Sequence, residues 1–266
     1  LVAQRGRPGG RIGPHEQLAV GVGSLLSRDR RRMPTSQRLD LAGELARAHL
    51  RWTVKDPVLR AKLTPDYRLG CKRILFANNY YPALQAENCK LVTWPIARLS
   101  PRGIRTVEGI EHQFDAIVFA TGFEVCKAGT PFAITGVDGR DLASEWSRGA
   151  YAYRSVAVSG YPNLFFTFGP NSGPGHSSAL VYMEAQIDYI VEAIGALLRF
   201  GWKALDVRPD AQARFNDDIQ RRLRATTWNS GCQSWYLTED GFNATMFPGF
   251  ATQYVGQLKS MDLRDY

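Results

Sequence analysis

The stretch "FFTFGPNSGPGHSSALVYMEAQ", residues 165–186, limits the possible folds most strongly, because an aromatic run passes through a Gly/Pro-rich loop directly into a helical pattern. Three glycines give this loop access to positive φ and to close backbone approach, and two prolines restrict its motion. These residues are Gly169, Gly173, Gly175, Pro170 and Pro174. A helix that follows such a loop presents backbone N–H groups and its positive dipole end. The pattern predicts a loop that faces another body.

The sequence predicts both amphipathic helices and strands, as in an α/β fold. Helices are expected over about 37–52, from Asp56-Pro57 to near Thr64, after Asp141, up to about Arg199, and from Pro209 to about Arg224. Strands are expected at "KRILFA", "CKLVTW", "IARLS", "GIRTV", "FDAIVFA", "NLFFTF" and "KALDV". The run "DAIVFA" is apolar on both faces, as in a strand buried inside a sheet.

The positive charge of the chain is concentrated at one end. Residues 1–34 hold seven arginines against Glu16 and Asp29, and therefore carry five of the eight net positive charges of the sequence. The arginines alternate with glycine and proline, without an interleaved aromatic residue. This composition predicts a disordered, solvated arm and argues against a nucleic-acid-binding surface, which remains the alternative.

The four cysteines, Cys71, Cys89, Cys126 and Cys232, form no CxxC pair. Their spacing argues against a zinc site and against a disulfide framework, and indicates a reducing compartment. No apolar run has the length of a membrane span, and no secretory signal is present. We therefore expect a cytoplasmic protein with no bound metal and no membrane contact.

A dinucleotide-binding turn is one interpretation of the loop. Residues 173–178 follow a GxGxxS pattern, and Asp206 lies near the end of the next strand candidate. However, four residues separate Phe168 from Gly173, whereas the first glycine of that fingerprint belongs directly after the strand. A second candidate, Gly21-Val22-Gly23, follows no strand. Both candidates are weak.

Three segments together resemble the flavin-containing monooxygenases, and most closely their Baeyer–Villiger branch. These are "DAIVFATGF", "GYPNLFFTFGPNSGPGH" and "GCQSWYLTEDGFNATMFPGF", with "GCKRILFANNYYPAL" similar to the segment upstream. The resemblance covers about residues 40–255 in the family's order and spacing. The family's GxGxxG motifs for FAD and NADPH, its His- and Trp-containing fingerprint and its oxygenation arginine have no counterpart in this sequence.

The resemblance implies a partial flavoprotein fold with two dinucleotide-binding (Rossmann-like) domains that lacks the N-terminal FAD βαβ unit. Residues 1–34 are then the basic arm and 35–65 a helical segment. Residues 66–122 correspond to the C-terminal part of an NADPH-binding domain, and 123–266 to the C-terminal segment of an FAD domain. The implied activity is NADPH- and O₂-dependent oxygenation of a small ketone or heteroatom-containing compound.

The resemblance also implies cofactor-binding residues. FAD would contact Thr121, Gly122, Gly169, Pro170, Asn171, Gly173, Gly175 and His176, and NADPH would contact Lys72, Arg73 and Trp235. In the family this tryptophan lies on a segment that closes over nicotinamide and substrate and excludes water. The catalytic residues stay unknown, with His176 and Trp235 as weak candidates.

Three hypotheses remain open from the sequence. The chain is part of such a monooxygenase, with or without a separate chain that carries the N-terminal half; or it is an inactive remnant; or it is a nucleic-acid-binding module that uses its basic arm. Because the FAD pyrophosphate turn is missing, we expect the chain alone to bind FAD weakly.

Overall fold

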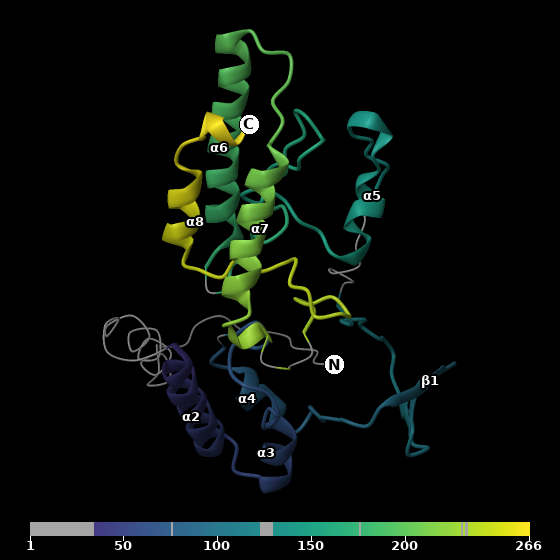
Figure 1. The fold of residues 1–266 in the computed structure, drawn as a ribbon. Coiled ribbons are helices and arrows are strands. Elements are labelled where there is room, and N and C mark those ends of the chain that lie inside the picture. Colours follow the sequence, from purple (N-terminus) through teal and green to yellow (C-terminus); the bar gives the residue numbers. More distant parts are fainter. Residues whose placement is uncertain (1–34, 76, 123–129, 176, 230, 232–233) are drawn as a thin grey trace, which may run out of the picture. The chain divides into compact units, whose positions relative to one another are not determined.

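The computed structural model describes residues 35–266, except residues 76, 123–129, 176, 230, 232 and 233 (Figure 1). The described residues divide into two compact units. The first holds residues 35–69 and 75–122, and the second holds residues 70–74 and 130–266. The basic arm of residues 1–34 and its glycine pattern lie outside the described residues, as does His176.

The helices of the first unit are α2 (Thr35–Thr53), α3 (Pro57–Leu63) and α4 (Tyr80–Leu84). The first two confirm the predicted helices. The Asp56 carboxylate accepts a hydrogen bond from the Val58 N–H at 2.9 Å, and so caps α3, which has proline in its first turn. The short helix α4 was not expected, because its five residues contain no amphipathic repeat.

The sheet of the first unit is an antiparallel meander of β1 (Ile96–Ser100), β2 (Gly103–Thr106) and β3 (Glu111–Gln113), in the order β1-β2-β3. The strands predicted at "IARLS" and "GIRTV" are confirmed. Gly103 pairs with both neighbouring strands, and a Cβ there would lie 1.9 Å from the His112 carbonyl oxygen. Only glycine fits this position.

Five of the predicted strands are wrong: "KRILFA", "CKLVTW", "FDAIVFA", "NLFFTF" and "KALDV" form no named strand in the described residues. Within "DAIVFA", the side chains of Val118 and Phe119 are 68% and 70% exposed rather than buried. A parallel strand needs hydrogen-bonding neighbours from other parts of the chain. In the part of the chain that the structure describes, these segments have no such neighbours beyond isolated bridges.

The α-helices of the second unit are α5 (Leu142–Glu145), α6 (Ala179–Phe200), α7 (Pro209–Leu223) and α8 (Ala251–Leu258). Short 3-10 helices, η1 to η4, cover Val137–Gly139, Trp146–Arg148, Thr227–Asn229 and Leu263–Asp265. Helices α5, α6 and α7 confirm the predictions, whereas α8 lies in a region expected to be irregular. Among the described residues, no helix combines the length and the apolar character that crossing a membrane requires.

The main core of the second unit joins α6, α7 and α8, and α6 and α8 run side by side (Figure 1). It is dominated by fully buried tyrosines, Tyr182 and Tyr189 on α6 and Tyr254 on α8. The rings of Tyr182 and Tyr254 lie 4.3 Å apart, centroid to centroid. This packing fixes α6, and therefore the place where the Gly/Pro-rich loop enters the helix.

Candidate functional site

The loop at residues 169–175 is anchored to a segment far along the chain, residues 243–247. The buried Asn171 side chain donates from Nδ2 to the carbonyl oxygens of Asn243, at 2.7 Å, and Met246, at 3.1 Å. Backbone hydrogen bonds from Asn171 to Ala244 and from Gly173 to Thr245 run alongside. The polar groups in the first half of the loop therefore form hydrogen bonds within the chain.

The glycines of the loop are required by close packing, not by positive φ. The expected left-handed conformation is absent from Gly169, Gly173 and Gly175, and is found instead at Phe168 (φ 58°) and Asn171 (φ 57°). A Cβ on Gly169 would lie 2.3 Å from the Ser155 carbonyl oxygen. One on Gly173 would lie 2.7 Å from the Thr245 carbonyl oxygen, so both positions exclude any larger residue.

The second half of the loop leads into the N-terminus of α6. Ser178 is the N-cap residue, and its Oγ accepts a hydrogen bond from the Leu180 N–H at 3.2 Å. The other N–H groups of the first turn have no partner within the helix by its geometry, and they carry the positive end of the helix dipole. This end of α6 is therefore suited to an anionic or electron-rich group.

An aromatic group adjoins the loop at Gly175, where a Cβ would lie 2.7 Å from Cζ2 of Trp228. The Trp228 ring meets the buried Tyr236 ring edge to face at 6.1 Å, and Tyr236 in turn lies 4.4 Å from the Trp235 ring. The Trp235 side chain is 47% exposed. The structure thus connects two predicted residues, Gly175 and Trp235, through two aromatic rings.

Arg73 belongs to the same group. Burial raises the pKa of the Tyr236 phenol, and the Arg73 guanidinium opposes this rise, so the cation lies within electrostatic reach of the phenol. Lys72 and Arg73 are both exposed and precede the point where the chain passes from the second unit to the first. They do not begin a strand, in contrast to the prediction.

The sequence argued against disulfide bonds, and for Cys71 this prediction is wrong. Cys71 is fully buried and disulfide-bonded, whereas Cys89 is free. Cys126 and Cys232 lie outside the described residues. Cysteine spacing alone does not define which cysteines pair, so the sequence pattern does not reveal this bond. The bond restrains the chain two residues before Arg73.

The remaining predicted residues, Thr121 and Gly122, lie in the first unit and are exposed. Gly122 has φ +88°, which favours glycine, and a Cβ there would meet nothing within 4 Å. The structure therefore supports the expected turn at Gly122. It does not relate this turn to the loop at 169–175.

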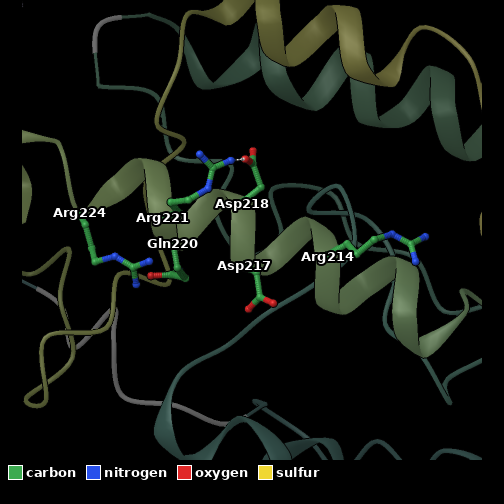
Figure 2. A pocket seen from close by; sticks show the side chains of 6 residues that line it. All are labelled: Arg214, Asp217, Asp218, Gln220, Arg221 and Arg224. Carbon is green, nitrogen blue, oxygen red and sulfur yellow. Dashed lines mark hydrogen bonds and ion pairs between the residues drawn. The ribbon is translucent and has the colours of Figure 1, made fainter.

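Two shallow depressions of the second unit lie elsewhere. One, of about 420 Å³, is lined by charged and polar side chains of α7 and by Arg224 directly after it. Arg221 pairs with Asp218, and Arg214 and Arg224 lie at opposite ends of the depression (Figure 2). The other, of about 490 Å³, is lined by residues 134–137 and 161–164. Neither contains a predicted site residue. No group of acidic, His and Cys side chains among the described residues could hold a metal ion.

Sequence reasoning missed the residues that organise the site, chiefly Trp228 and Asn243. Trp228 and Asn243 lie in or near the aromatic, Gly-rich region that carries the resemblance, but no local pattern assigns them a contact. This α/β chain places a Gly/Pro-rich loop at a helix N-terminus, and two aromatic rings link the loop to an exposed tryptophan. These are features of a site for an aromatic, anionic cofactor.

Comparison with known proteins agrees with this class. No family model matches the chain. The chain is 41% identical over 232 residues to a Baeyer–Villiger monooxygenase of Pseudomonas aeruginosa. The match covers 86% of this chain and 44% of that protein. A Baeyer–Villiger monooxygenase of Streptomyces coelicolor is 39% identical over 230 residues, with the same two shares.

Solved structures give the same relationship. The chain is similar to an oxidized steroid monooxygenase bound to NADP, with TM-score 0.76 and 28% identity over 96% of this chain and 51% of that one. It is also similar to cyclohexanone monooxygenase from Rhodococcus sp. Phi1 bound to NADP+, with TM-score 0.75 and 25% identity. That match covers 84% of this chain and 43% of the other. The resemblance to the Baeyer–Villiger monooxygenases is confirmed over most of the chain's own length. The chain spans about half the length of these relatives.

Proposed function

We propose that the chain is the C-terminal part of an FAD- and NADPH-dependent Baeyer–Villiger-type monooxygenase that oxygenates a small ketone or a heteroatom-containing compound. The observation that carries the proposal is the continuity from Gly175 through Trp228 and Tyr236 to Trp235 and Arg73. It joins the loop expected at the flavin to the residues expected at NADPH.

The residues present fit the isoalloxazine end of FAD. Reduced flavin carries negative charge at its N1/C2=O edge, and the N-terminus of α6 beyond Ser178 offers N–H donors and a positive dipole to such an edge. Bound FAD, reduced by NADPH, would supply the oxygen-activating chemistry. The chain's part is to orient the ring through the loop at 169–175 and through His176, which directly follows it.

The residues present also fit part of NADPH. Arg73 and Lys72 are exposed cations, and a guanidinium suits a phosphate dianion because it can donate two parallel hydrogen bonds. Trp235 exposes nearly half of its side chain beside Tyr236, and we expect this exposed part to stack on the cofactor or cover it. Such a cover would keep water from the reacting flavin.

Titration with FAD tests the proposal in two preparations: the chain alone, and the chain joined to the N-terminal half of its Pseudomonas aeruginosa relative. We expect the chain alone to bind FAD with a Kd above about 1 μM, because the described residues contain no strand–glycine turn–helix unit for the pyrophosphate. The joined protein should retain FAD and oxidise NADPH in the presence of O₂ and a ketone. A joined protein that folds without binding FAD would contradict the proposal.

Substitution of Arg73 tests the NADPH side. In the joined protein, Arg73→Ala should raise the KM for NADPH about tenfold or more through the loss of a charge-assisted phosphate contact, while the bound flavin stays unchanged. Arg224→Ala removes an exposed arginine directly after α7 and serves as the matched control. Equal effects of the two substitutions would show that Arg73 acts only through net charge.

A further inference from the structure

The side chain of Gln186 is fully buried in the second turn of α6 and uses both ends of its amide. Its Oε1 accepts a hydrogen bond from the Phe168 N–H at 2.5 Å. Its Nε2 donates to the Tyr254 hydroxyl at 2.7 Å and to the Ser155 carbonyl oxygen at 3.4 Å. One side chain therefore connects three segments that are distant in sequence.

These contacts converge on strained backbone. Arg154, Ser155 and Phe168 have φ values of 49°, 64° and 58°, in the left-handed region that residues with a side chain rarely occupy. Gln186 binds the backbone of two of them, and the Tyr254 hydroxyl reaches the carbonyl oxygen of Arg154 at 3.5 Å. Such conformations persist only where surrounding contacts hold them, and they concentrate at functional sites.

The strained residues define how the chain enters the loop. Phe168 directly precedes Gly169, which packs so closely on the Ser155 carbonyl oxygen that a Cβ would lie 2.3 Å from it. The Phe168 side chain is 47% exposed, so core packing of its ring does not account for its conformation. The hydrogen bond from its N–H to Gln186 fixes the direction of that N–H, and so restrains the peptide plane relative to which the Phe168 φ is set.

We propose that Gln186 is a positioning residue, which holds Phe168 in its left-handed conformation and thereby fixes the loop at 169–175 against the N-terminus of α6. The importance of this loop for flavin rests on the proposed function, whereas the restraint itself is a property of this chain. Gln186 acts through the backbone of Phe168 and touches neither cofactor nor substrate.

Three substitutions in the full chain separate this role from simple core filling. Gln186→Met keeps a similar volume but loses all three hydrogen bonds. Tyr254→Phe removes only the phenol at the other end of the amide and is the matched control. Phe168→Gly is the rescue, because glycine adopts positive φ without a restraint.

Amide hydrogen exchange of peptides that cover residues 165–175 is the readout. We expect Gln186→Met to speed exchange of this segment about tenfold or more, and Tyr254→Phe to change it less than about threefold. Combined with Phe168→Gly, the Gln186→Met substitution should add little to the exchange rate of Phe168→Gly alone. The non-additivity is the signature of a shared restraint.

Unchanged exchange in Gln186→Met would overturn the inference, and so would additive effects in the double variant. If Gln186→Met fails to fold, the double variant decides the question: recovery of folding supports the restraint, and continued failure refutes it. Addition of FAD to each preparation tests the proposed function separately. A loop that FAD does not protect in any variant, in the chain alone or in the joined protein, would count against the flavin site and leave the role of Gln186 intact.

Discussion

The two glycines Gly175 and Gly195 show how differently the surroundings of one residue type constrain it. A Cβ on Gly175 would lie 2.7 Å from Trp228 Cζ2 and 3.7 Å from Met246 Cε. A Cβ on Gly195, inside α6, meets nothing within 4 Å. The expectation that Gly175 needs positive φ is wrong, and its constraint is the contact with the Trp228 ring.

These surroundings predict opposite effects of alanine. Gly175→Ala should destabilise the protein by about 1–3 kcal/mol, because the Trp228 ring must shift to admit a methyl group. Gly195→Ala should stabilise it by about 0.5–1 kcal/mol through helix propensity. Urea unfolding measures both, and tryptophan fluorescence should change only for Gly175→Ala. Equal destabilisation by the two substitutions would rule out this account.

Glu145 is the centre of a polar cluster at α5. Its carboxylate accepts two hydrogen bonds from Arg140, at 2.6 and 2.7 Å, and one each from the hydroxyls of Tyr161 and Tyr151. The Arg140 hydrogen bonds hold the pKa of Glu145 below its ordinary value of 4.5. The charged carboxylate is therefore favoured by the folded state.

The sign of this shift predicts a pH dependence. A lowered folded-state pKa contributes stability that is present above pH 4.5 and is lost as the pH falls through the folded-state pKa. Glu145→Gln should therefore lower the Tm at pH 7, and the difference from the unsubstituted chain should shrink below pH 4.5. A difference in Tm that stays constant from pH 7 to pH 3 would contradict this prediction.

At the scale of elements, the N-terminus of α6 depends on Ser178. The Ser178 hydroxyl accepts the Leu180 N–H, and an N-cap of this kind stabilises by about 0.5–2 kcal/mol. Ser178→Ala should reduce stability by that amount. Ser178→Asp keeps the cap and adds a charge that favours the helix dipole, so it should retain stability.

Ser178→Ala and Ser178→Asp together also distinguish the effect of the helix cap on stability from its effect on the proposed cofactor site. In the joined protein, Ser178→Asp should weaken binding of reduced FAD, because its carboxylate repels the negative edge of the ring. Bound flavin per chain and urea unfolding on one preparation measure the two properties. If Ser178→Asp retained both stability and affinity for reduced FAD, α6 would not face the flavin.

The helices could be predicted from the sequence because their signals are local. Asp56-Pro57 and Asp141 mark helix starts, and the accepted hydrogen bonds are those that their positions imply. The strands of a parallel sheet could not be predicted in this way. An apolar run such as "DAIVFA" forms a strand only where segments from other parts of the chain pair with it. Of the site, the resemblance indicated the loop and Trp235. The contact from Gly175 to Trp228 is a tertiary fact that no local pattern records.

At the scale of the whole molecule, the two units differ in their cores. Every cluster of buried apolar side chains in the described residues lies in the second unit, around α5 and around α6, α7 and α8. The first unit leaves many apolar side chains exposed, among them Trp94, Ile96 and Phe119. Since burial of apolar surface is the main source of stability, the second unit should be the more stable.

Hydrogen exchange along the chain tests this difference. Amides of α6, α7 and α8 should exchange about a hundredfold or more slowly than those of α2, α3 and the β1-β2-β3 sheet. Limited proteolysis should leave a resistant body that contains residues 130–266. Equal protection of both units, or preferential survival of the first, would show that the described packing does not set the order of stability.

Residues 70–74 belong to the second unit although residues on both sides of them in sequence belong to the first. This interleaving governs how gene segments can be exchanged between relatives. A chimera with one crossover near residue 123 would take the second unit from one parent but Cys71 and Arg73 from the other. A chimera with two additional crossovers, flanking residues 70–74, keeps Arg73 with Tyr236 and should be the better-folded hybrid.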